Sequence, residues 1–204
     1  MGPSQWGFQL DIPDFKSIVE QARKQNFPIL ELESAQLLYF ICLLHKPNQI
    51  LELGTGLGYS TRHMAAALSK CIFYLCDYRQ DLLESVSAEL GDFECHLFAG
   101  SVIENLKNIN QTFDLIFLDI DKRDYLNAFN LSWSKLKPDG LMVVDNVFFS
   151  GQVFQDNPKK KQGVQSILQL IDKIKPVPSC LFPVGDGLLV IKKPIIQQTD
   201  SLQS

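Results

Sequence analysis

The sequence has few of the residues that mark zinc-finger, disulfide-linked or membrane proteins. It has three histidines and five cysteines in 204 residues, with no Cys-x-x-Cys pair and no zinc-ligand spacing. We therefore expect reduced, mostly buried thiols in a cytoplasmic protein. No apolar run is long enough to span a bilayer. The first residues, MGPSQWGFQLDIPDF, have neither the basic nor the apolar region of a signal peptide.

An excess of positive charge is also missing. The net charge is −4 and the isoelectric point about 5.4, which disfavours a protein that holds nucleic acid by bulk charge. The one basic run, residues 159–161, is predicted to be a solvated loop rather than an RNA contact. With 46% apolar residues, the chain can bury one core, so we expect a single domain. It would comprise residues 1–204, with a helical segment at 1–27 and a frayed polar tail at 197–204.

The apolar pattern alternates between strand and helix after two helical stretches. Near-continuous apolar strands separated by helices predict an α/β fold, with a parallel sheet covered on both faces. The last two strands are joined by residues 185–187 only, which predicts a hairpin whose final strand is antiparallel to its neighbours. Helices are expected at 14–25, 31–45, 59–70, 79–90, from 101, 124–136 and 163–174, and strands at 49–53, 71–77, 93–100, 113–119, 141–146, 179–184 and 187–193.

Polar residues follow several of the predicted strands. Ligands of parallel α/β sheets bind outside the carboxyl ends of the strands. We therefore expect the functional site there. The stretches to consider are 52–60, Asp77, 100–102, 119–122 and 145–146.

The first of these stretches, LELGTGLGYS, is a glycine loop between a strand and a helix. Its G-x-G-x-G spacing differs from the G-x-G-x-x-G of nicotinamide-dependent dehydrogenases. Together with Glu52 and with Asp77, which can accept both hydroxyls of a ribose, it is typical of S-adenosylmethionine methyltransferases. Glu52 can reach an ammonium group. Ser60 is either a helix cap or a contact to a carboxylate of the cofactor. Residues 101–102 either border an adenine or form an ordinary turn capped by Ser101.

The second feature is a cluster of oxygen-bearing side chains. Asp119 ends one predicted strand, and Asp145 and Asn146 end its neighbour. Adjacent strands lie about 5 Å apart, so these side chains can converge on a hard cation such as Mg²⁺, Mn²⁺ or Ca²⁺. The alternative is that each acid caps a helix or lies in a loop. Lys122 is a candidate general base or an ordinary surface lysine, and Asp121 is predicted to cap the helix that follows.

With these motifs, the chain resembles the cation-dependent O-methyltransferases of the catechol and caffeoyl-CoA type over residues 28–193. The matching segments are ILELGTGLGYST, FDLIFLDIDKRDYLNAF, LKPDGLMVVDNVFFSG and FPVGDGLLVIKK. The resemblance implies a Rossmann-like class I methyltransferase fold with strand order 3-2-1-4-5-7-6, and often a homodimer. It also implies metal ligation by Asp119, Asp145 and Asn146, catalysis by Lys122, and cofactor contacts from Glu52, Gly54, Tyr59, Ser60, Asp77, Ser101, Val102 and Asp119.

The expected reaction is methyl transfer from S-adenosylmethionine to a metal-coordinated hydroxyl of a small, catechol-like aromatic acceptor. Phe148 and Phe149 are candidates to line the acceptor pocket, whereas Trp133 is predicted to pack in the core. The stretch after Gly151 shows no match to the catechol-binding carboxylate of the mammalian type. The alternatives are a methyltransferase for hydroxylated uridine in tRNA, a nicotinamide-dependent dehydrogenase, and a non-catalytic binding protein.

Overall fold

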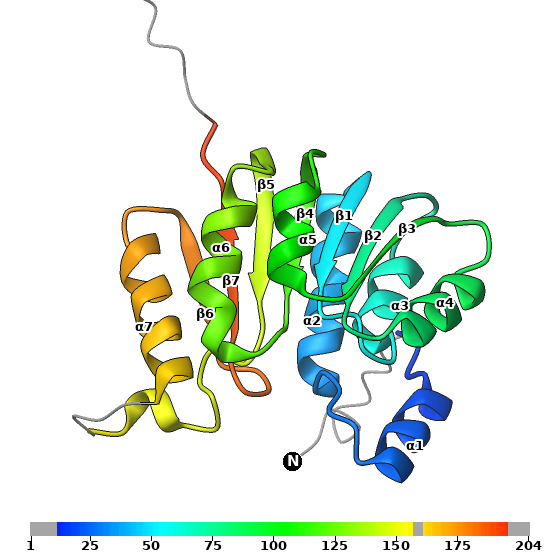
Figure 1. Ribbon diagram of the computed structural model, residues 1–204, viewed down its shortest axis with the longest axis horizontal. Helices are drawn as coiled ribbons and strands as arrows, with labels where there is room; N and C mark the ends of the chain where they lie inside the picture. The colour runs from blue at the N-terminus through cyan, green and yellow to red at the C-terminus, as the bar shows by residue number, and fades with distance from the viewer. Residues whose placement is uncertain (1–11, 157–160, 196–204) are drawn as a thin grey trace, which may run out of the picture.

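The computed structural model describes residues 12–156 and 161–195 and contains one seven-stranded sheet (Figure 1). The strand order is β3-β2-β1-β4-β5-β7-β6, which confirms the predicted order. Lys159 and Lys160 of the basic run, the tail at 197–204 and the first eleven residues of the N-terminal segment lie outside the described residues.

The direction of the strands also follows the prediction. β1 to β5 pair in parallel, whereas β7 is antiparallel to both β5 and β6. The tight connection before β7 therefore forms the expected hairpin. The strands are β1 (Gln49–Leu53), β2 (Ile72–Asp77), β3 (Glu94–Ala99), β4 (Phe113–Leu118), β5 (Leu136–Val144), β6 (Ser179–Phe182) and β7 (Leu188–Lys192).

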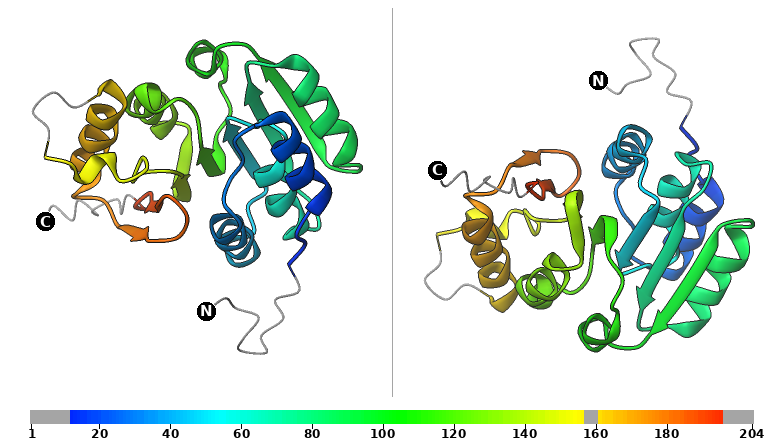
Figure 2. Two further views of the ribbon diagram at one scale, coloured as in Figure 1. Left: turned by 90° about the horizontal axis from the view of Figure 1, so that it is seen from below. Right: turned by 90° about the horizontal axis from the view of Figure 1, so that it is seen from above.

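Helices cover both faces of the sheet, which Figure 2 shows in views along the sheet from below and above. One core cluster joins the sheet to α5, α6 and α7, and the other joins it to α1, α2, α3 and α4. The helices are α1 (Lys16–Gln25), α2 (Leu32–His45), α3 (Tyr59–Ala66), α4 (Gln80–Glu89), α5 (Val102–Asn108), α6 (Tyr125–Trp133) and α7 (Gln162–Ile174), with short 3₁₀ turns η2 (Lys122–Asp124) and η3 (Gln152–Phe154).

Strand β4 shows why the central strands are apolar on both sides. Ile116 and Leu118 point into the cluster under α5 to α7, whereas Leu115 and Phe117 point into the opposite cluster. All four side chains are fully buried. An apolar strand with no outward polar face is therefore required here.

The sequence prediction was wrong at the start of β5. A helix was expected to run to residue 136 and a strand to begin at 141, but α6 ends at Trp133 and β5 begins at Leu136. Leu136 pairs with Phe113, and the ladder shifts register before Leu115. The Pro-Asp-Gly sequence, which favours a turn, therefore lies within a strand because that strand pairs with its neighbour. The register shift is accommodated at Asp139, which has a positive φ of 64°.

Helix α2 carries large apolar side chains on its outer surface, which has no cover among the described residues. Phe40, Leu43 and Leu44 are 50%, 40% and 69% exposed. None of the described helices is long and apolar enough to cross a membrane.

The cysteines are free, as expected from their number and spacing. Cys42, Cys71 and Cys76 are buried and Cys95 is half-buried, whereas Cys180 is exposed. The prediction of mostly buried thiols is therefore confirmed, with Cys180 as the exposed exception.

Candidate active site

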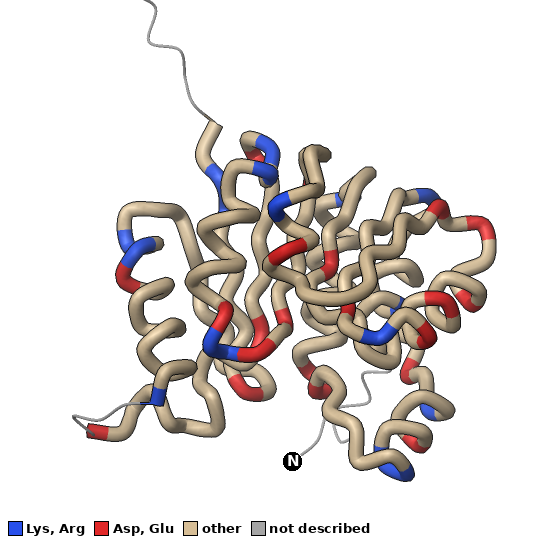
Figure 3. The backbone as a smooth tube through the Cα atoms, in the orientation of Figure 1, with Lys and Arg blue, Asp and Glu red and all other residues tan. Residues whose placement is uncertain are grey.

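A cleft of about 410 Å³ lies at the carboxyl ends of β1, β2, β4 and β5. The segment 27–31, which precedes α2, forms one wall. Acidic and basic positions gather around the ends of β4 and β5 at this edge of the sheet (Figure 3). Among the predicted site residues, those that line the cleft are Gly54, Tyr59, Ser60, Asp77, Asp119, Lys122 and Asn146.

The glycine loop brings the end of β1 against the end of β4. Gly54 has φ +97°, and a Cβ built there would lie 1.9 Å from the carbonyl oxygen of Asp119. Only glycine allows both this backbone conformation and this approach. The Gly56 amide donates to Asp77 Oδ2 at 2.8 Å, and the Arg79 amide donates to Oδ1 of the same carboxylate at 3.0 Å. Asp77 thus holds the loop in place at the floor of the cleft.

Glu52 lies beneath this loop and is fully buried. Its two carboxylate oxygens accept hydrogen bonds of 2.5 Å from the hydroxyls of Ser60 and Thr61. Burial raises the pKa of Glu52 to about 8, although the two hydrogen bonds oppose that rise. Glu52 is therefore placed to fix the first turn of α3, and it does not line the cleft in this structure.

Ser60 and Ser101 differ in their local roles. The helix-cap alternative is wrong for Ser60, because Gly58 is the N-cap of α3 and Ser60 donates to Glu52. It is confirmed for Ser101, whose hydroxyl accepts the Glu104 amide at 3.4 Å at the start of α5. Val102 is buried in the core cluster below.

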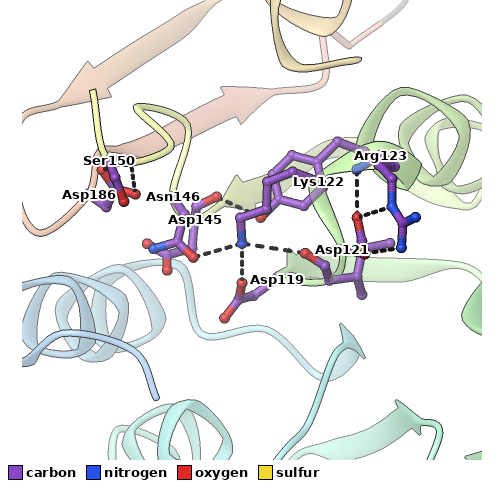
Figure 4. Close-up of polar contacts among 10 residues, drawn as sticks. Asp119, Asp121, Lys122, Arg123, Asp145, Asn146, Ser150 and Asp186 are labelled. Carbon is purple, nitrogen blue, oxygen red and sulfur yellow. Dashed lines mark hydrogen bonds and ion pairs between the residues drawn. The ribbon is translucent and has the colours of Figure 1, made fainter. Parts of the chain in front are cut away.

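The acidic cluster converges as predicted, with a lysine at its centre (Figure 4). Lys122 Nζ donates to Asp119 Oδ1 at 3.0 Å and to Asn146 Oδ1 at 2.8 Å. A third contact joins it to the Ile120 carbonyl at 3.4 Å. The side chain of Lys122 is only 16% exposed, so the alternative of an ordinary surface lysine is wrong.

Asp145 is the deepest member of the cluster. It is 1% exposed, and neither carboxylate oxygen has a well-formed hydrogen bond among the described residues. Burial, and then the neighbouring charge of Asp119, raise its pKa to about 7, although the nearby Asn146 amide lowers this pKa somewhat. A buried acid without a partner is costly, which points to a ligand of positive charge at this position.

Sequence reasoning missed the support from Tyr125. Its hydroxyl donates to the Asp145 carbonyl at 2.8 Å, and Lys122 Nζ lies 5.1 Å from the centre of its ring. The available signal was the spacing from Lys122 to Tyr125, because residues three apart share one side of a helical turn. The Tyr125 ring therefore contacts Lys122, and its hydroxyl contacts Asp145.

Two predictions about the neighbouring residues are confirmed. Asp121 caps η2 by accepting the Arg123 amide at 2.9 Å, and it also pairs with the Arg123 guanidinium. Trp133 packs on the core, where its ring stacks on Phe129 with centroids 5.1 Å apart. Trp133 therefore does not line the cleft.

The cluster fits a divalent cation by its chemistry. Two carboxylates and a carboxamide are hard oxygen donors. The unpartnered oxygens of Asp145 would gain a counter-charge from such an ion. Among the described residues, no group of three or more acidic, histidine or cysteine side chains is placed to hold a metal ion, here or elsewhere. The donor set at the ends of β4 and β5 is thus a mixed one that includes an amide.

A cleft over a glycine loop, on a sheet of this order, defines the Rossmann-like class I methyltransferase fold. The O-methyltransferase family model matches residues 93–194. Caffeoyl-CoA O-methyltransferase 2 of Zea mays is 30% identical over 196 residues, which are 82% of this chain and 71% of the relative. The chain belongs to the O-methyltransferase family.

Two further comparisons agree with this family. Catechol O-methyltransferase of Niastella koreensis is 32% identical over 131 residues, or 60% of this chain and 58% of that protein. The structure of the O-methyltransferase TomG from Streptomyces achromogenes, in complex with SAM, has a TM-score of 0.75 at 24% identity and covers 91% of this chain and 93% of that one. The chain is thus an O-methyltransferase of the caffeoyl-CoA and catechol type.

Proposed function

We propose that this protein transfers a methyl group from S-adenosylmethionine to a hydroxyl of a small, catechol-like aromatic acceptor, with the help of a divalent cation. The observation that carries the proposal is the convergence of Asp119, Lys122, Asp145 and Asn146 beside the glycine loop. The SAM complex of the similar TomG structure supports the choice of cofactor.

The cofactor would lie over the glycine loop. Asp77 ends β2 with its carboxylate at the cleft and can accept the ribose hydroxyls, in exchange for its bond to the Gly56 amide. Tyr59 and Ser60, in the first turn of α3, also border the cleft. Glu52 would act by holding Ser60 and Thr61 in place, rather than by direct contact with the ligand.

Asp119, Asp145 and Asn146 would hold the divalent cation, which supplies Lewis-acid polarisation of the acceptor hydroxyl. Lys122 is the basic group nearest to this set. In its neutral amine form it would accept the proton of the hydroxyl. S-adenosylmethionine would supply the methyl group to the deprotonated oxygen, and its sulfur would leave as a neutral thioether.

The chain's main contribution would be the alignment of the two reactants in the cleft. Correct orientation of two reactants is worth up to about 7–11 kcal/mol in favourable systems. The turn after β5 carries Phe148 and Phe149 next to the cluster, and Phe149 approaches Lys122 across Gly163. Neither phenylalanine lines the cleft itself in this structure, so we assign them to an acceptor pocket beside it.

The test is calorimetric titration of S-adenosylmethionine and then of caffeic acid, each with Mg²⁺ and with a chelator. We expect the cofactor to bind in both conditions and the catechol to bind only with Mg²⁺. Asp145→Ala should abolish metal-dependent turnover and leave cofactor binding intact. Turnover that persists in chelator would remove the metal from the proposal.

If the cofactor binds and no catechol does, larger acceptors should be tested next. Binding of tRNA would then be recognised by a steep loss of affinity with rising salt, which a small phenol would not show.

We further propose that the enzyme is a homodimer. The exposed apolar surface of α2, formed by Phe40, Leu43 and Leu44, is the candidate contact. Sedimentation of the wild type and of Leu44→Asp tests this assignment. A wild type that sediments as a monomer at micromolar concentration would contradict it.

A further inference from the structure

Lys122 uses all three of its donors, and two of them bond to the proposed metal ligands. An ammonium group has three donors. They contact Asp119 Oδ1, Asn146 Oδ1 and the Ile120 carbonyl at 3.0, 2.8 and 3.4 Å. Two of these acceptors are side chains of the proposed ligand set, so the ammonium lies where a cation would meet them (Figure 4).

The lysine satisfies this set only in part. Asp145, the third proposed ligand, keeps both oxygens unpartnered among the described residues. With its donors already engaged, the ammonium has none left for that carboxylate. It also carries a single positive charge against two acids. A divalent cation, which takes six or more oxygen ligands, would serve all three side chains.

The backbone of Lys122 is held in place on two sides. Asp121 caps η2 at its start, and the Cβ of Lys122 lies against Gly163, where an added Cβ would be 3.1 Å away. Movement of the ammonium can therefore come only from torsions of its four-carbon stem. The face of the Tyr125 ring, 5.1 Å from Nζ, offers a second favourable contact for the charge.

We propose that Lys122 is an internal counter-ion that occupies the ligand set in the metal-free protein, and that a divalent cation must displace it to bind. This inference rests on the proposed metal site. It adds that the Lys122 ammonium and the divalent cation compete for the same ligands. The lysine keeps Asp119 and Asn146 in position before metal arrives, and it lowers the apparent affinity for the metal.

The experiment measures Mn²⁺ binding to the full chain by electron paramagnetic resonance, at fixed pH and without substrate. The variant is Lys122→Met, which keeps the apolar stem and removes the ammonium. The matched control is Arg123→Met, which removes the same charge one residue away. Arg123 is paired with Asp121 and contacts none of the proposed ligands among the described residues. Lys122→Gln, which retains two amide donors without the charge, is a second variant in case the first does not fold.

We expect Lys122→Met to bind Mn²⁺ at least tenfold more tightly than the wild type, with Lys122→Gln between them. Arg123→Met should change the affinity by less than threefold. In chelator, Lys122→Met should melt at a lower temperature than the wild type, and Mn²⁺ should raise its melting temperature more than it raises that of the wild type. General damage to the site would weaken metal binding, which is the opposite direction.

Unchanged or weaker binding by Lys122→Met would overturn the displacement, as would an equal gain in Arg123→Met. If neither the wild type nor the variants bind Mn²⁺, the proposed metal site fails and this inference fails with it. Titration of S-adenosylmethionine in chelator then shows whether the methyltransferase proposal still stands. The two failures are therefore distinguishable.

Discussion

The substitution Glu52→Gln is expected to stabilise the protein at pH 8 and to have little effect at pH 4.5. Glu52 is fully buried, and its carboxylate accepts the hydroxyls of Ser60 and Thr61. A glutamine has the same shape. Its amide oxygen accepts one hydroxyl and its NH₂ donates to the other, because a hydroxyl can also accept.

The magnitude follows from the pKa of Glu52, which burial raises from 4.5 to about 8. Below pH 4.5 the folded and unfolded chains both carry the proton. Between pH 4.5 and 8 the unfolded chain loses the proton and the folded chain keeps it, so the free energy of unfolding falls by about 1.4 kcal/mol per pH unit. Over this window the loss reaches up to about 5 kcal/mol. Above pH 8 both states are ionised and the loss is complete.

Urea denaturation at several pH values from 4.5 to 8.5, in chelator and without cofactor, measures the effect. The free energy of unfolding of Glu52→Gln minus that of the wild type should rise with pH over this range. Glu84→Gln, an exposed position paired with Gln80, is the matched control and should show no such trend. A difference that is flat with pH, or that falls, would refute the assignment of Glu52 as a buried acid that stays neutral in the folded protein.

Three further predictions concern the glycine loop and the acidic cluster. Gly54→Ala should cost more than about 3 kcal/mol of stability, because the new Cβ would meet the Asp119 carbonyl at 1.9 Å. Gly100→Ala has the same positive φ but open space, so its melting temperature should fall much less. Tyr125→Phe leaves the Asp145 carbonyl without its hydroxyl donor and should cost about 1–3 kcal/mol in thermal denaturation. Asp145→Asn should raise the stability of the metal-free protein above pH 7, because it removes a buried carboxyl group whose pKa is raised to about 7. A lower stability of the variant in urea and chelator would contradict this.

Much of the fold could be predicted from the sequence because its signals are local. The apolar run at 115–118 has no outward polar face, and this alone indicates a strand buried on both sides. The period of apolar residues and the spacing of motifs do not show, however, which distant strands pair. The turn-like sequence at 138–140 lies inside β5 because β4 and β7 pair with the residues around it.

The candidate site divides in the same way. The sequence placed Asp119, Asp145 and Asn146 at neighbouring strand ends, and the structure brings them together. The enclosure of Lys122 was not predictable, because two of its three acceptors lie on side chains that meet only when β4 and β5 pair. Nor was the contact of Tyr125 with Asp145, twenty residues apart.

The sequence by itself determined the α/β class, the glycine loop at the end of β1 and the identity of the oxygen-bearing residues, because strand period and turn chemistry act over a few residues. The tertiary structure decided the charge state and the partners of those residues. Glu52 became a buried acid with two hydroxyl donors, and Lys122 became the counter-ion of Asp119. The physical reason is that burial and electrostatic pairing depend on distances between strand ends, and those distances exist only in the assembled sheet.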